Sequence, residues 1–217
     1  MRVGILFDLD GTLLDTLQDL TDSTNAALRH FSCPERTREE MRRFIGNGAR
    51  MQITRALPGT DNDPDVQDVL AFYRAYYQDH CQIRTAPYPG VGKALAELTD
   101  YPIAIVSNKP DGAVKALCSR FFPHIYAVGE LADCPRKPAP DMIYRTMAHL
   151  GVDSCIYVGD SEVDVHTAKN AGVRCLCVTW GFRDEEDLRA AGAQQLCHAP
   201  EELAPMLKTM IGEYHGQ

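Results

Sequence analysis

Two aspartates separated by one residue follow directly after the first apolar run of the chain. That run, Val3–Phe7, has the length and composition of a buried strand, and Asp8-Leu9-Asp10-Gly11-Thr12 comes next. If the strand continues, alternation turns both carboxylates the same way. Two such carboxylates repel each other and need a cation, or one of them must hold a proton. Oxygen ligands favour a hard cation, so the pair predicts a Mg²⁺ site.

Polar groups also follow three later apolar runs. Ser107 and Asn108 come after Ile103–Val106 and offer a hydroxyl and an amide. Lys137 comes after a run near 125–128, and Asp160 after Ile156–Val158, with Asp164 four residues further on. Ligands of open α/β sheets bind at the carboxyl ends of the strands. The sequence therefore predicts one crevice in which carboxylates and a lysine meet, and in which Thr12, Ser107 and Asn108 can bond phosphate oxygens.

The elements that must position these groups alternate along the chain. Short apolar runs predict strands, and helical patterns near 90–99, 110–121, 140–150 and 161–171 separate them. Gly151 and Gly172 are placed as helix C-caps. This βαβ series predicts an α/β fold with a doubly wound, mostly parallel sheet. The strand ranges beyond the first are Ile103–Val106, Ile125–Val128, Ile156–Val158 and Cys175–Thr179.

One long segment interrupts the alternation. Between about 16 and 86 only helical patterns are found, at Thr16–Phe31, Arg38–Phe44 and Asp65–His80. We therefore predict a core of residues 1–15 and 87–217, with an inserted helical cap at 16–86. The tail from Asp184 predicts two more helices, the second over about Pro200–Ile211.

The ordered motifs resemble those of the haloacid dehalogenase superfamily over essentially the whole chain. This resemblance implies a Rossmann-like core and a phosphatase that forms an aspartyl-phosphate. It implies Asp8 as nucleophile and Asp10 as acid and then base. It also implies Mg²⁺ bound by Asp8, the Asp10 carbonyl and Asp160, with Asp164 supporting the metal and Ser107 and Lys137 holding the phosphoryl oxygens.

Within the superfamily the chain is similar to the phosphoglycolate phosphatase group. The segments that carry this finer likeness are Asp15-Thr16, Asn108-Lys109-Pro110-Asp111, Lys137-Pro138-Ala139-Pro140 and Trp180-Gly181-Phe182. In the cap, Gly46, Asn47, Gly48 and Arg50 resemble a substrate loop, although a solvated turn with a surface arginine is the alternative interpretation. Phosphoglycolate is the first choice of substrate; pyrophosphate, nucleotides and small sugar phosphates stay open.

Other function classes share parts of this pattern. A phosphoaspartate receiver lacks the second aspartate, and a metal-free dehalogenase typically lacks it too, so Asp10 argues against both. A phosphonoacetaldehyde hydrolase uses a cap lysine, and residues 16–86 contain none. A sugar phosphomutase of the β-phosphoglucomutase kind shares all four motifs and remains the alternative.

Composition limits the partners. The formal net charge of -8 argues against nucleic acid, which normally needs a basic face. No apolar stretch approaches the ~18 residues of a membrane helix. None of the eight cysteines forms a C-x-x-C pair, which indicates reduced thiols. We expect a cytoplasmic protein whose partner is a small phosphorylated metabolite; the sequence gives no oligomeric state.

Overall fold

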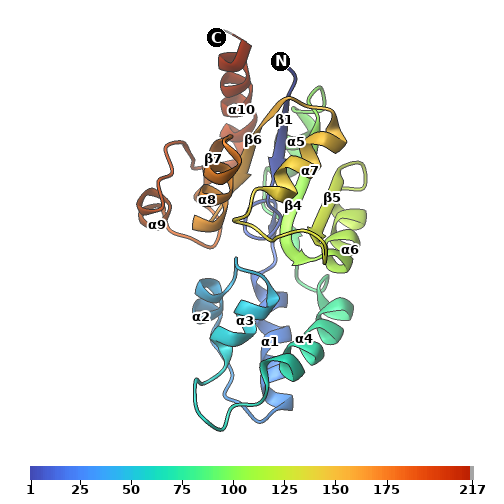
Figure 1. Cartoon of the computed structure of the whole chain (residues 1–217), viewed down its shortest axis with the longest axis vertical. Helices are drawn as coiled ribbons and strands as arrows, with labels where there is room; N and C mark the ends of the chain where they lie inside the picture. Colours follow the sequence, from blue (N-terminus) through green and yellow to red (C-terminus); the bar gives the residue numbers. More distant parts are fainter. Residues whose placement is uncertain (216–217) are drawn as a thin grey trace.

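Six parallel strands form the central sheet of the computed structural model, which describes residues 1–215 (Figure 1). Their order is β5-β4-β1-β6-β7-β8, so β1 lies inside the sheet with a neighbour on each side. The strands are β1 (Val3–Phe7), β4 (Ile103–Pro110), β5 (Tyr126–Glu130), β6 (Ser154–Gly159), β7 (Arg174–Val178) and β8 (Leu196–Cys197).

Helices cover both faces of this sheet. Ile5 and Phe7 of β1 belong to the larger apolar core, while Leu6 between them belongs to a second core on the opposite face. The first core contains side chains of α5 (Val91–Ala96), α6 (Asp111–Phe121) and α10 (Pro200–His215), and the second those of α7 (Asp141–Leu150) and α8 (Glu162–Ala171). A short helix, α9 (Glu185–Ala190), packs beside α8. The predicted doubly wound α/β fold is therefore confirmed.

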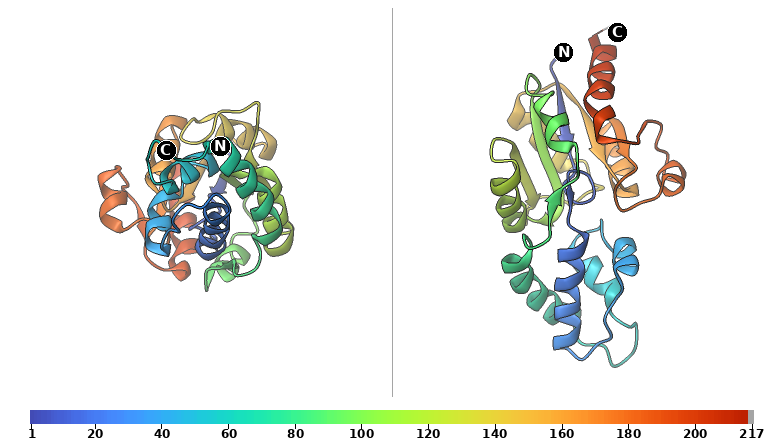
Figure 2. Two further views of the ribbon diagram at one scale, coloured as in Figure 1. Left: turned by 90° about the horizontal axis from the view of Figure 1, so that it is seen from below. Right: turned by 180° about the vertical axis from the view of Figure 1, so that it is seen from behind.

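Four helices lie together at the carboxyl end of β1, below the sheet in Figure 1 and in the right view of Figure 2. They are α1 (Leu17–His30), α2 (Arg38–Phe44), α3 (Ala49–Ala56) and α4 (Val66–His80). A short antiparallel pair joins them to the sheet, formed by β2 (Leu14–Asp15) and β3 (Ala86–Pro87).

Asp19 links the end of this helical segment to its beginning. Its carboxylate is 2% exposed and accepts the backbone N–H of Arg84 at 2.9 Å and that of Thr85 at 2.9 Å. The Thr85 hydroxyl also donates to it, at 2.8 Å. A buried carboxylate is stable only when its oxygens are hydrogen-bonded. Here Arg84 and Thr85, just before β3, provide those bonds.

The element boundaries follow the sequence patterns with informative differences. β1 has the predicted range, and α7 and α8 end at Gly151 and Gly172, whose φ angles of 63° and 66° suit a residue without Cβ. β4 is longer than predicted, because the chain stays extended to Pro110 after a register shift beyond Val106. The sequence patterns missed α3, the two-residue strands β2, β3 and β8, and the last turn of α10.

Candidate active site

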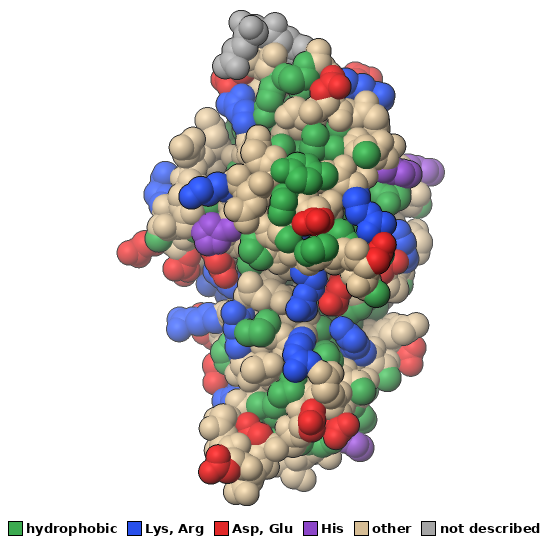
Figure 3. Space-filling view, viewed as in Figure 1, with side chains coloured by type: hydrophobic (Ala, Val, Ile, Leu, Met, Phe, Trp, Pro, Cys, Tyr) green, Lys and Arg blue, Asp and Glu red, His purple; other side chains and the backbone are tan. Residues whose placement is uncertain are grey.

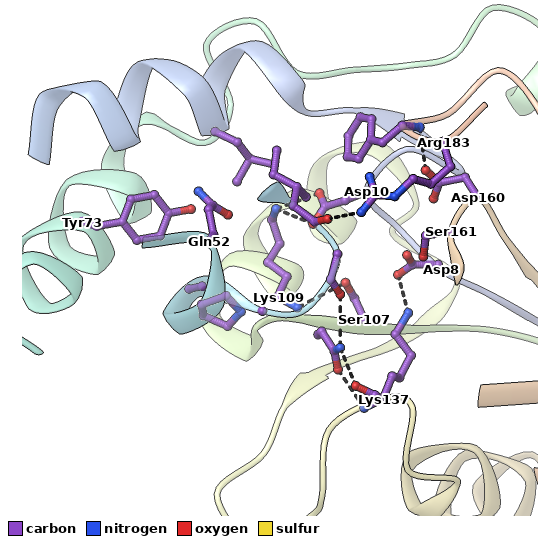
Figure 4. Close-up of a pocket in the computed structure, with 18 residues that line it drawn as sticks. Asp8, Asp10, Gln52, Tyr73, Ser107, Lys109, Lys137, Asp160, Ser161 and Arg183 are labelled. Atoms are coloured by element: carbon purple, nitrogen blue, oxygen red, sulfur yellow. Dashed lines mark hydrogen bonds and ion pairs between the residues drawn. The ribbon is translucent and has the colours of Figure 1, made fainter. Parts of the chain in front are cut away.

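A pocket opens between the carboxyl ends of the central strands and helices α1, α3 and α4 (Figure 4). It is lined by residues of both parts of the chain: Asp8, Asp10, Leu20, Ile45, Gly46, Gly48, Ala49, Gln52, Tyr73, Ser107, Asn108, Lys109, Pro110, Lys137, Asp160, Ser161, Phe182 and Arg183. Most of the residues predicted from the strand ends are therefore neighbours. Thr12, Asp164, Asn47 and Arg50 do not line the pocket.

Asp8 lies at the end of β1 against the ammonium of Lys137. Lys137 Nζ is 2.9 Å from Asp8 Oδ1 and donates to Asp164 Oδ1 at 2.9 Å and to the Tyr157 hydroxyl at 2.7 Å. Burial alone would disfavour the charged lysine, but Asp164 and Asp8 together raise the pKa of Lys137 above its ordinary value. The lysine is therefore a fixed positive charge beside the first aspartate.

Three buried carboxylates form a cluster here, and two of them, Asp8 and Asp164, pair with this lysine. Oxygens of Asp8, Asp160 and Asp164 all lie within 4.8 Å of one another. Burial, with repulsion from Asp164 and Asp10, raises the pKa of Asp8 to about 7 even though Lys137 opposes the shift. Burial and repulsion from Asp164 and Asp8 also raise the pKa of Asp160. One ammonium does not balance this charge, so the cluster suits a further cation.

Asp8 Oδ1 supplies a second reason to expect a cation. Among residues 1–215 no donor bonds it at acceptable hydrogen-bond angles, although the Lys137 contact is close. A buried carboxylate oxygen whose close partner is a poorly aligned ammonium is only partly satisfied, and a divalent ion bound by oxygens would complete its bonding. The residues therefore fit a hard metal ion at Asp8 and Asp160. Asp164 is 0% exposed and lies behind them.

Asp160 is held by residues from two distant segments. Its Oδ2 accepts the backbone N–H of Phe182 at 2.7 Å, and its Oδ1 accepts the Thr12 hydroxyl at 3.0 Å. Two glycines let the backbone approach it. A Cβ on Gly11 would lie 2.2 Å from Asp160 Oδ2, and one on Gly181 would lie 2.4 Å from the same atom. The structure thus turns the Thr12 hydroxyl toward Asp160 rather than toward the pocket where we expected it to bond phosphate.

Asp10 is turned away from the other carboxylates. Its oxygens accept Lys109 Nζ at 2.7 and 2.8 Å, and Oδ1 also accepts the Thr16 hydroxyl at 2.7 Å. Lys109 was not among the predicted site residues, although it sits in the segment after Ser107. Because β4 stays extended to Pro110, it carries Ser107, Asn108 and Lys109 together to the pocket. A prediction that the strand continues past Val106 would have placed Lys109 at the pocket as well.

Ser107 and Asn108 line the pocket in different ways. The Asn108 amide accepts the backbone N–H of Lys137 at 2.9 Å and donates to the Lys137 carbonyl at 2.9 Å. The Asn108 amide therefore fixes the backbone of Lys137 and has few hydrogen-bonding sites left for a ligand. The Ser107 hydroxyl accepts only a long bond from the backbone N–H of Lys109, at 3.3 Å, and its proton remains available to an anion.

The helical side of the pocket differs from the predicted loop. Gly46 and Gly48 line the pocket, but Arg50 is exposed. In its place the structure brings in Gln52, Tyr73 and Arg183, which sequence patterns did not single out. They come from segments far apart in the sequence and show no local motif, so tertiary packing alone brings them together.

Arg183 joins the two sides of the pocket. Its guanidinium donates to the carbonyls of Arg42 and Ile45, each at 2.8 Å, and to Glu162 at 2.7 Å. Arg42 and Ile45 belong to the end of α2, and Glu162 begins α8 beside Asp160. Arg183 therefore ties α2 to the loop that holds the acidic cluster.

Comparison with known proteins decides the family. The family of haloacid dehalogenase-like hydrolases matches residues 5–178. The chain belongs to this family. The predicted superfamily is thus confirmed, and the motifs above lie within the matched range, apart from the Trp180-Gly181-Phe182 segment.

Individual relatives and solved structures support this family assignment. The chain is 36% identical over 193 residues to a phosphoglycolate phosphatase of Mesorhizobium japonicum, covering 84% of this chain and 85% of the relative. A solved structure described as a candidate phosphoglycolate phosphatase from Lactobacillus delbrueckii is 34% identical with a TM-score of 0.88, covering 95% and 99%. A CbbY variant from Rhodobacter sphaeroides, solved with xylulose-(1,5)bisphosphate, is 25% identical with a TM-score of 0.77, covering 94% and 96%. The predicted likeness to the phosphoglycolate phosphatase group is confirmed.

Proposed function

We propose that this hydrolase is a Mg²⁺-dependent phosphatase that cleaves phosphoglycolate through a phosphorylated Asp8. The observation that carries the proposal is the pairing of Asp8 with Lys137 inside a buried carboxylate cluster that suits a divalent ion. The phosphoglycolate phosphatases among its relatives support the choice of substrate. We also propose that residues 16–86 act as a cap over the pocket, and that the eight cysteines, all free thiols, reflect a reducing compartment such as the cytoplasm.

The metal would be held by Asp8, the Asp10 carbonyl and Asp160. Bound there, Mg²⁺ would neutralise the phosphoryl oxygens and offset their repulsion from the carboxylates. Asp164 would keep the position of Lys137 and of the Asp160 backbone, because it bonds both.

The chain's own residues can then perform two displacements. In the first, an Asp8 oxygen attacks phosphorus, the bond to the ester oxygen breaks, and Asp10 gives that oxygen its proton. In the second, Asp10 takes a proton from water as the water attacks phosphorus, and the bond to Asp8 breaks to release phosphate. Ser107 and Lys137 lie beside Asp8 and bind the oxygens of the transferring group.

The surface around the pocket suits an anionic ligand. Figure 3 shows Lys and Arg side chains gathered across the middle of this face, between the sheet and the four helices. Arg136 lies beside Gly48 of the pocket wall. The chain carries a net charge of -8, so such a local band of positive charge favours the approach of a small phosphate ester. None of the helices within residues 1–215 combines the length and apolar character needed to cross a bilayer.

The test is phosphate release from a panel of small phosphate esters with Mg²⁺, repeated in excess chelator. We expect turnover of phosphoglycolate that requires the metal, and none by Asp8→Asn. Asp10→Asn should slow alkyl esters by ~10²–10⁴-fold, whereas p-nitrophenyl phosphate, which has a better leaving group, should phosphorylate the enzyme and leave it trapped. Intact mass would show the trapped phosphoenzyme. Full activity in chelator, or equal first-step losses for both ester types, would refute the proposal, and transfer to a sugar without free phosphate would indicate a mutase.

A further inference from the structure

Lys109 is a buried cation whose role the reaction described above does not require. It is 4% exposed, and its ammonium lies 4.8 Å from the centre of the Tyr77 ring. Among residues 1–215, Asp10 is the one carboxylate within ion-pair distance of it. A buried ammonium needs a partner to offset the lost hydration, and Asp10 is that partner.

This pairing holds Asp10 away from the position that its acid–base role requires. Lys109 bonds both carboxylate oxygens, and Thr16 adds a second bond to Oδ1. A general acid must present a protonated oxygen to the leaving group within hydrogen-bond reach. In the arrangement shown, Oδ1 accepts two donors and Oδ2 one, so Lys109 and Thr16 hold the carboxylate in place, and it has to give up at least one of these bonds to turn toward a leaving group at Asp8.

The position of Lys109 indicates what could break it. Figure 4 shows the lysine between Asp10 and the end of the pocket formed by Gln52 and Tyr73, on the side away from Lys137. A phosphate ester with its phosphoryl group at Asp8 would extend its remaining atoms in this direction.

The other cations of the pocket are committed elsewhere. Lys137 forms ion pairs with Asp8 and Asp164, and Arg183 donates to Glu162 and to two backbone carbonyls. The amide nitrogen of Gln52 donates to the Thr24 hydroxyl at 2.8 Å. Lys109 is therefore the cation best placed for a negative group on the substrate's other end.

We propose that Lys109 binds the substrate's carboxylate, and that this exchange of partners releases Asp10 for acid–base work. The proposal rests on the phosphatase function proposed above and adds a criterion for substrates. A substrate without the negative group leaves the Lys109–Asp10 pair intact and is turned over slowly. The ammonium keeps an anionic partner throughout, so the exchange does not strand a buried charge.

The experiment compares two esters of equal length, 2-phosphoglycolate and 2-hydroxyethyl phosphate, on wild type, Lys109→Gln and Lys109→Arg. Wild type should prefer the carboxylate ester by at least ~10-fold in kcat/KM, as expected for a bond to a charged group. Lys109→Gln should lose ~10–100-fold on phosphoglycolate and keep or raise its rate on the neutral ester, since the ammonium no longer holds Asp10. Lys109→Arg should restore part of the preference. Lys93→Gln, at an exposed lysine, is the matched control and should change neither rate.

Three results would overturn the proposal. One is a wild type that does not distinguish the two esters, which needs no variant to fold. Another is an equal loss on both esters in Lys109→Gln, as a purely structural lysine would give. The third is a preference that survives in Lys109→Gln. If one of these results is found while phosphate release still depends on Asp8, the phosphatase function stands and only the role of Lys109 is refuted. If no ester releases phosphate, the phosphatase function itself is refuted.

Discussion

Asp164 should contribute more to folding than any exposed carboxylate of this chain. It is fully buried, and its oxygens accept Lys137, Tyr157 and the backbone N–H groups of Asp160 and Ser161. In Asp164→Asn the amide can still accept the backbone N–H groups, but its NH₂ then faces the Lys137 ammonium. Removing one partner of a buried ion pair costs about 3–5 kcal/mol.

One effect reduces this cost. Asp164 repels Asp8 and Asp160, since it contributes to the raised pKa of both, and the substitution relieves that repulsion. We therefore expect the lower end of the range, about 3 kcal/mol, which is a large part of the ~5–15 kcal/mol of a typical domain. With a urea m-value of ~2 kcal/mol/M, the unfolding midpoint should fall by about 1.5 M.

The assay is urea unfolding in EDTA, so that metal binding does not enter the comparison. Asp133→Asn is the control, because Asp133 pairs with Arg145 at 3.1 Å but is 73% exposed. Exposed pairs contribute about 0–1 kcal/mol, so its midpoint should barely move. If Asp164→Asn unfolds at the same urea concentration as Asp133→Asn, Lys137 is not held by Asp164 as the structure has it.

Two further predictions concern pH and the contact between α2 and the acidic loop. Burial, with repulsion from neighbouring carboxylates, raises the pKa of Asp8 from 3.8 to about 7 in the metal-free protein, so its contribution to stability is complete below pH 3.8 and is lost as the pH rises through 7. Melting temperatures in EDTA should therefore fall between pH 5 and pH 8, and less so in Asp8→Asn; an equal fall in both proteins would contradict the shift. Arg183→Gln should raise KM for every ester by ~10-fold, because bonds from a charged guanidinium to the end of α2 are lost. Arg50→Ala, which removes an exposed arginine outside the pocket, should leave KM within about twofold by the usual size of surface effects, and equal effects of the two variants would show that Arg183 does not shape the pocket.

The sequence was sufficient for features that depend on local pattern. The apolar run Val3–Phe7 defines β1 because a strand buried on both faces needs uninterrupted apolar residues. The aspartates after it and after Ile156–Val158 meet because parallel strands end at the same edge. The order of the motifs then indicated the family.

Side-chain direction was harder to predict. Thr12 faces Asp160 because the turn at Gly11, with φ of 82°, redirects the chain after Asp10. Lys109 was overlooked because the strand was expected to end at Val106, and a residue assigned to a loop has no predictable face. Arg183 and Gln52 enter the pocket through packing between distant segments, for which a single sequence gives no signal.

Asp19 has a mechanical consequence for the whole molecule. The chain crosses between the sheet and the four helices twice, and independent bending at the two crossings would let the helices twist in many directions. Because Asp19 bonds Arg84 and Thr85, and β2 pairs with β3, the two crossings are fastened to each other and would have to bend together, as one hinge. Thr16 lies at the start of α1, on the helical side of that hinge, while its partner Asp10 lies on the sheet side. Any outward swing of the helices about these crossings would therefore also withdraw the Thr16 hydroxyl from Asp10.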